Sequence, residues 1–295
     1  MQINDLHKKY GRVHAVNGLS MQVNQGEIFG LLGPNGSGKT TTLGILLDVT
    51  NKSSGEFSWF GKPGNHKIRQ KIGAILESPC FYPYLSGFAN LQVVAAIKEV
   101  NKNRIGEVLK VVGLFARKDD KFKTYSLGMK QRLAIAAALL PDPNVLILDE
   151  PTNGLDPQGI KEIRDLIIEI GNTGKTIILA SHLLNEVQKV CTHFAVLNFG
   201  KKVYQGSVNE ALSGETIYEV KAQDLLLLEK TIKKSAWIKL VDKESDCMLV
   251  SLPADKNAAA LNQALAQDQV YLSHLSARKK NLENEFLKIL SKSNA

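Results

Sequence analysis

The chain has 295 residues, 44% of them hydrophobic and 22% charged, which is typical of a globular protein with one large domain or two of ordinary size. Apolar stretches such as residues 133–140 fall far short of the roughly 18 residues that a membrane-spanning helix needs, and the first residues lack the pattern of a secretory signal. The net charge of +8 comes mostly from scattered lysines and arginines, which favours a solvated surface over a nucleic-acid-binding patch.

The first segment of the chain that indicates a chemical function is a strand–loop–helix unit near the N-terminus. Residues 27–32 read as a buried strand, residues 33–40 follow the pattern Gly, four residues, Gly-Lys-Thr, and residues 41–47 read as a helix. Glycines let the backbone fold so that successive N–H groups point at one anion, and the helix N-terminus adds its positive dipole. The unit predicts a nucleotide site at Gly33, Pro34, Asn35, Gly36, Ser37, Gly38, Lys39, Thr40 and Thr41.

Two residues of this loop have distinct predicted tasks. The ammonium group of Lys39 adds a point charge at the β- and γ-phosphates of ATP. The hydroxyl group of Thr40 is a candidate ligand of Mg²⁺.

Two acidic residues follow an uninterrupted apolar strand at residues 145–148. Ligands of α/β sheets bind beyond the carboxyl ends of the strands, so Asp149 is expected beside the phosphate loop, where it orients Mg²⁺ or its waters. Glu150 can accept a hydrogen bond from the attacking water and act as the general base. Such a pair also occurs at ordinary solvated strand ends, but a phosphate loop in the same chain favours the functional interpretation.

The remaining elements predict two domains. Up to residue 214, strands alternate with helices, for example a helix at 157–170 and a strand at 176–180, which predicts an α/β domain with a mostly parallel sheet. Residues 215–295 have a different pattern and form a second, accessory domain in this prediction. Its expected order is β-α-β-β-α-β, a split βαβ (ferredoxin-like) α+β fold, at residues 215–221, 224–234, 236–241, 247–252, 255–267 and 269–273, followed by a helix at 281–290.

With these motifs in order, roughly residues 1–205 resemble the ATP-binding cassette (ABC) family of P-loop NTPases. Tyr10 stands where the family has an aromatic residue that stacks on adenine. The signature helix begins at residues 125–129, with Ser126 and Gly128 as its phosphate-facing residues. The D-loop corresponds to residues 153–156 and contributes Asp156, and the switch histidine, which holds the catalytic arrangement, corresponds to His182.

The resemblance also implies an architecture and a mechanism. The cassette is expected to combine its core sheet with an antiparallel β subdomain and a helical signature subdomain. Two copies are expected to form a head-to-tail homodimer, in which Ser126 and Gly128 of one copy cover the ATP held by Lys39 of the other. Hydrolysis would remove the γ-phosphate and loosen the dimer, converting chemistry into motion.

Three positions depart from the common family pattern. Leu127 stands where the signature usually has glycine, and Met129 where it has glutamine. Glu77 replaces the usual glutamine of the Q-loop; it can still bind Mg²⁺ but cannot donate a hydrogen bond as an amide does. These variants resemble bacterial cassettes of ABC-2-type exporters, including the bacitracin-resistance-like subgroup.

The resemblance predicts the ATP-hydrolysing subunit of an exporter, peripheral on the inner face of a bacterial plasma membrane and bound to a separate permease at about residues 77–123. The aromatic residues there also suit core packing. Cysteines at positions 80, 191 and 247 indicate a reducing compartment. The alternative, a soluble ATPase that acts on nucleic acid or the ribosome, is weakened by the presence of only one phosphate loop and the short spacing from Lys39 to Ser126. The accessory domain is expected either to stabilise a dimer or to sense a ligand.

Overall fold

The computed structural model describes residues 1–76, 80–213, 216–253, 255–278 and 281–293. They form two compact units, one made of Met1–Val208 with the chain from Phe286 onward, the other of Asn209–Glu285. None of the helices in these ranges combines the length and the apolar character of a bilayer-spanning segment.

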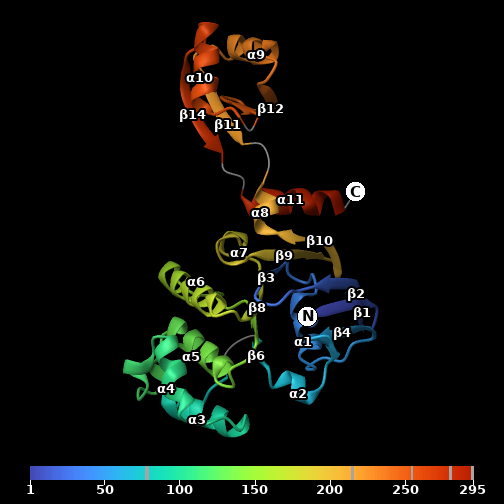
Figure 1. Cartoon of the computed structure of the whole chain (residues 1–295), viewed down its shortest axis with the longest axis vertical. Coiled ribbons are helices and arrows are strands. Elements are labelled where there is room, and N and C mark those ends of the chain that lie inside the picture. The colour runs from blue at the N-terminus through green and yellow to red at the C-terminus, as the bar shows by residue number, and fades with distance from the viewer. Residues whose placement is uncertain (77–79, 214–215, 254, 279–280, 294–295) are drawn as a thin grey trace. The chain divides into compact units, whose positions relative to one another are not determined.

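A six-stranded, mostly parallel sheet forms the centre of the first unit (Figure 1). The strand order is β10-β9-β3-β8-β7-β6, and only the β9–β10 pair is antiparallel. The strands are β3 (Ile28–Leu32), β6 (Ile72–Ile75), β7 (Val145–Asp149), β8 (Thr176–Ser181), β9 (His193–Asn198) and β10 (Lys201–Ser207). Every residue of β3, β7 and β8 is buried, as expected for strands covered on both faces.

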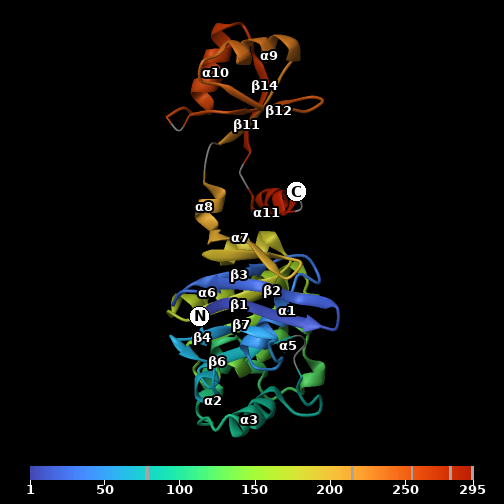
Figure 2. The same cartoon turned by 90° about the vertical axis from the view of Figure 1, so that its right-hand side faces the viewer.

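A four-stranded antiparallel sheet of order β2-β1-β4-β5 shares the core of this unit (Figure 2). Its strands are β1 (Gln2–Tyr10), β2 (Val13–Gln22), β4 (Ser54–Trp59) and β5 (Lys62–Pro63). Leu6 and Trp59 belong to the same buried cluster as Phe29 of β3, and the Trp59 indole N–H donates to the Leu46 carbonyl oxygen at 3.2 Å. The indole is therefore buried without an unsatisfied donor.

The helices of the first unit differ in their surroundings. Figure 1 shows α3, α4 and α5 gathered away from the antiparallel sheet. The helices are α1 (Lys39–Leu46), α2 (His66–Arg69), α3 (Gly87–Ile97), α4 (Arg104–Val111), α5 (Leu127–Leu139), α6 (Pro157–Asn172) and α7 (Leu184–Val190), with 3₁₀ turns at Phe115–Arg117 and Phe122–Thr124. The predicted α/β class, with its antiparallel and helical parts, is confirmed.

The second unit has the expected order β-α-β-β-α-β, and its sheet of order β12-β13-β11-β14 is entirely antiparallel. Its elements are β11 (Ile217–Ala222), α9 (Leu225–Lys234), β12 (Lys239–Lys243), β13 (Met248–Ser251), α10 (Ala258–Gln267) and β14 (Leu272–Arg278). Two further helices are α8 (Val208–Leu212) and α11 (Leu282–Ser293).

Two strands of the second unit begin three residues later than the sequence predicts. The strand expected at 269–273 starts at Leu272, because Gln269 has a left-handed φ of 59° and closes the end of α10 by donating to the Ala266 carbonyl oxygen at 3.0 Å. The strand expected at 236–241 starts at Lys239, because the Ser235 hydroxyl accepts backbone hydrogen bonds within a turn. Both shifts arise from local turn chemistry that competes with strand formation.

Helix α9 allows a matched test of the second unit's core. Leu228 is completely buried, whereas Leu226 is 68% exposed. We expect Leu228→Ala to lower the free energy of opening of this unit by about 2–5 kcal/mol, because it leaves a cavity. Leu226→Ala should change it by less than about 0.5 kcal/mol. Hydrogen exchange of β11 and β13, followed by mass spectrometry, measures both values, and equal effects would contradict the assignment of the core.

Candidate nucleotide-binding site

The loop after β3 takes its shape from glycines that contact other backbone segments. A Cβ on Gly33 would lie 2.4 Å from the Leu197 carbonyl oxygen, and a Cβ on Gly38 would lie 2.4 Å from the Ala15 carbonyl oxygen. Gly36 has a φ of 78° and no atom within 4 Å of its would-be Cβ, so the middle of the loop is open. The glycines thus allow both the tight fold and the close approach of an anion.

Helix α1 begins at Lys39 without a side-chain cap on its first N–H groups. The Lys39 side chain is 7% exposed, and its ammonium group donates to the carbonyl oxygen of Gly33 at 2.8 Å. Thr40, the next residue, is exposed. Uncapped amides, an ammonium group and a hydroxyl converge here, which fits a phosphate chain with its metal ion.

Electrostatics at Lys39 also fit an anionic ligand. Burial lowers the pKa of the Lys39 ammonium, while the carboxylates of Glu150 and Asp149 act in the opposite direction. The Glu150 carboxylate lies 4.0 Å from Lys39 Nζ. A triphosphate beside Nζ would favour the charged form further.

Glu150 and His182 meet directly beside this loop. Glu150 follows the buried Asp149 at the end of β7, and its Oε2 lies 2.8 Å from His182 Nδ1. Its backbone N–H donates to the Ala180 carbonyl oxygen of β8 at 2.9 Å. Glu150 has a φ of 48°, a conformation that costs a non-glycine residue about 1–3 kcal/mol and that concentrates at functional sites.

Tyr10 lies at the turn of the β1–β2 hairpin and is 51% exposed. The Lys8 ammonium lies 4.6 Å from the centre of its ring. The carbonyl oxygen of Ala15, in the same hairpin, lies close to Gly38, so the hairpin is adjacent to the phosphate loop. The adenine-stacking role of Tyr10 stays a prediction.

The signature and D-loop residues lie at two helix starts. Ser126 caps α5 by accepting from the Met129 N–H at 3.2 Å, and Asp156 caps α6 by accepting from the Gly159 N–H at 3.0 Å. A Cβ on Gly128 would meet no atom within 4 Å. Among the described residues, no hydrogen bond or ion pair joins Ser126 to the Lys39 loop. Glu77 lies outside the described residues.

Segments that are distant in the sequence also support the phosphate loop, and the sequence did not predict them. Gly200, in the β9–β10 turn, donates its N–H to the Ser37 carbonyl oxygen at 3.1 Å, and a Cβ on Gly200 would lie 2.9 Å from the Ala15 carbonyl oxygen. The only signal in the sequence is a turn glycine, which has many uses. Only the contact with Ser37 in the folded structure shows that Gly200 supports the phosphate loop.

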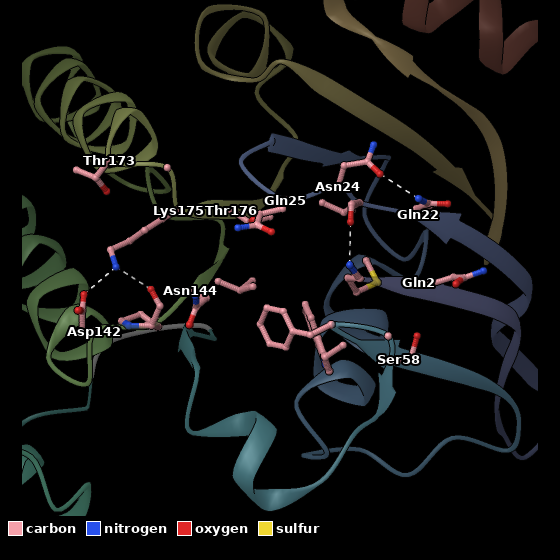
Figure 3. A pocket seen from close by; sticks show the side chains of 18 residues that line it. Gln2, Gln22, Asn24, Gln25, Ser58, Asp142, Asn144, Thr173, Lys175 and Thr176 are labelled. Atoms are coloured by element: carbon pink, nitrogen blue, oxygen red, sulfur yellow. Dashed lines mark hydrogen bonds and ion pairs between the residues drawn. The ribbon is translucent and has the colours of Figure 1, made fainter.

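A cavity of about 590 Å³ lies at the other end of the sheet strands, beside Val145 and Thr176 (Figure 3). Its lining includes several neutral side-chain amides, and the Lys175 ammonium there is engaged by Asp142 and by the Pro143 carbonyl oxygen, both at 2.8 Å. None of the predicted nucleotide residues lines it. The phosphate loop, with its uncapped helix and buried lysine, is therefore the better candidate.

Comparisons with known proteins agree with this geometry. The model of the ABC transporter family matches residues 16–153. The uncharacterized ABC transporter ATP-binding protein YdbJ of Bacillus subtilis (strain 168) is 38% identical, over 98% of this chain and 94% of its own length. The bacitracin transport ATP-binding protein BcrA of Enterococcus faecalis is 34% identical, over 98% of this chain and 96% of its own length.

A solved structure shows the same cassette fold in a dimer. The post-hydrolysis dimer of the ATP-binding cassette MJ0796, bound to ADP and Pi, matches with a TM-score of 0.63 and 25% identity, over 70% of this chain and 98% of that one. The alternative of a nucleic-acid or ribosomal ATPase is not supported, since the named relatives are transporter ATP-binding proteins. The chain therefore belongs to the family of ABC transporter ATP-binding proteins and is a nucleotide-binding ATPase of the cassette type.

Proposed function

We propose that this ATPase binds ATP with Mg²⁺ at residues 33–41 and hydrolyses it with Glu150 as the general base. The observation that carries the proposal is the convergence of the buried Lys39 side chain with the more exposed Glu150 and His182 side chains at the carboxyl ends of adjacent strands. Thr40 and Asp149, together with the predicted ligand Glu77, would hold Mg²⁺, which would neutralise phosphate charge during transfer.

The contacts of Glu150 indicate how the site could be activated. His182 occupies one oxygen of the Glu150 carboxylate at 2.8 Å, and Lys39 lies near the other. A bound triphosphate would offer the Lys39 ammonium and the His182 ring N–H a more highly charged acceptor than the Glu150 carboxylate. Movement of His182 toward the γ-phosphate would leave the carboxylate available to accept a proton from water.

Two copies of the chain would complete the site in a head-to-tail dimer. Ser126 and Gly128 belong to an open helix start that makes no hydrogen bond to the Lys39 loop of its own chain in the described residues. A γ-phosphate held by the partner could approach these N–H groups closely. Asp156 would lie at the interface between the two copies, and the dimer of the MJ0796 cassette supports an assembly of two cassettes.

The proposed partner outside the dimer is a separate permease that belongs to an ABC-2-type exporter. Tyr82 and Tyr84 are 49% and 66% exposed on the predicted docking surface, whereas Phe81 packs on Phe122 with ring centres 5.2 Å apart. The two tyrosines are therefore available for a partner, while Phe81 serves the core. The similarity to the bacitracin transport ATP-binding protein BcrA supports bacitracin, or a molecule like it, as the proposed cargo.

The proposed domain boundaries are 1–214 for the cassette and 215–295 for the accessory domain. The assembly would lie on the inner face of the plasma membrane, where the permease holds it. The accessory domain is proposed to stabilise the dimer.

Lys39→Ala tests the phosphate site. We expect ATP affinity to fall at least about tenfold, because each hydrogen bond to a charged group contributes about 1.5–3 kcal/mol. Lys161→Ala, at an exposed position of α6, is the matched control and should bind ATP as the wild type does. Titration with a fluorescent ATP analogue measures both, and unchanged affinity of Lys39→Ala would contradict the site.

Glu150→Gln tests the base and the dimer together. We expect turnover to fall at least about 100-fold, since a general base contributes that much or more, while ATP binding persists. The uncleaved γ-phosphate should then trap a dimer, which size-exclusion chromatography detects. Adding Ser126→Arg should keep the protein monomeric. A dimer that forms regardless of Ser126→Arg would show that the signature does not face the partner's ATP.

Capture from detergent-solubilised membranes of the natural host tests the permease. The tagged full chain should recover a multi-spanning membrane protein. Tyr82→Ala combined with Tyr84→Ala should lower recovery by at least about fivefold, since truncating an interface aromatic residue costs about 1 kcal/mol or more. Tyr271→Ala, at an exposed tyrosine of the second unit, should leave it unchanged. Equal recovery by all variants would contradict the docking surface.

A further inference from the structure

Leu127, the residue that departs from the common signature, contacts the D-loop of its own chain. It is the first residue of α5 and is 49% exposed. A Cβ on Gly154 would lie only 3.3 Å from Leu127 Cδ2, so the leucine side chain lies directly beside the position that a side chain at Gly154 would take. A glycine at position 127 would have no side chain to make this contact.

The loop under Leu127 leads directly to the general base. The Asn153 N–H donates to the Glu150 carbonyl oxygen at 3.1 Å, and the Leu155 N–H donates to the Thr152 carbonyl oxygen at 3.3 Å. Gly154, between these two bonds, has a φ of 76°. Because the loop is short and internally bonded, a displacement of Gly154 would be transmitted to the backbone of Glu150.

An ion pair also joins α5 to α6, the helix that follows the D-loop. Arg132 of α5 lies 3.6 Å from the Glu162 carboxylate of α6, and Glu162 also accepts from Gln158 at 3.1 Å. Arg132 is 23% exposed, and its Nε is buried without a hydrogen-bond partner among the described residues. This ion pair links α5 to α6 in addition to the contact at Leu127.

We propose that Leu127 is a positioning residue that couples the two ATP sites of the closed dimer. The inference rests on the proposed head-to-tail arrangement. Ser126 and Gly128, on either side of Leu127, would face the partner's ATP, while Leu127 contacts the loop that carries Glu150 of its own site. Closure of one site would therefore bias the placement of the base in the other, which is energetic coupling between the sites.

Steady-state hydrolysis by the full chain tests this proposal. We expect Leu127→Ala to lower kcat at least about threefold and to bring the Hill coefficient for ATP down to one, since removing a residue that links two sites weakens the coupling between them. The affinity of the monomer for a fluorescent ATP analogue should not change. Leu127→Met should retain the wild-type values, and so should Leu226→Ala, the same substitution at an exposed leucine of the second unit.

A double-mutant cycle tests the contact itself. Gly154→Ala would place a methyl group against Leu127, so its loss of kcat should be smaller when Leu127→Ala has made room. Additive losses would overturn the proposal, as would a wild-type Hill coefficient of one or unchanged kinetics of Leu127→Ala.

Measuring dimer formation distinguishes a failure of this proposal from a failure of the proposed function. In the Glu150→Gln background, Leu127→Ala should still form the ATP-dependent dimer, and loss of that dimer would make Leu127 an ordinary interface residue and overturn the coupling role. If Glu150→Gln alone forms no dimer with ATP, the proposed function fails, whatever the variants at position 127 show.

Discussion

The parallel register of β3, β8 and β7 is the constraint on which the site depends. Leu32 pairs with Ser181, and Asp149 pairs with Ala180, so three chain segments leave the sheet at the same level. Each strand is completely buried and cannot shift by one residue without exposing apolar side chains or burying polar ones. The distances between Lys39, Glu150 and His182 therefore follow from the packing of residues that never contact a nucleotide.

Much of the fold and of the site could be predicted from the sequence because their signals are local. The phosphate loop lies between a buried strand and a helix, and the acidic pair follows an apolar run, so both could be placed without knowledge of tertiary contacts. The order of elements in the second unit was predictable for the same reason. Strand starts were less accurate where a turn competed, as at Gln269, whose left-handed backbone no hydrophobic pattern reveals.

The unpredicted features involve partners that are distant in the sequence. Ala15 of β2 and Gly200 of the β9–β10 turn shape the loop, and Leu127 of a separate helix lies beside Gly154. In the sequence these residues are an alanine in a strand, a turn glycine and an atypical signature residue. Their significance depends on which backbone atoms lie within van der Waals distance, and this is set by the packing of the whole unit.

The cavity between Val145 and Thr176 has a practical consequence for inhibitor discovery. It lies at the amino ends of the strands, whereas Lys39 and Glu150 lie beyond the carboxyl ends, so a compound seated in it would leave the phosphate loop accessible. Such a compound would not displace a labelled nucleotide. A screen scored by nucleotide displacement would overlook it, whereas a screen scored by thermal shift would detect it, because a ligand of the folded state stabilises that state.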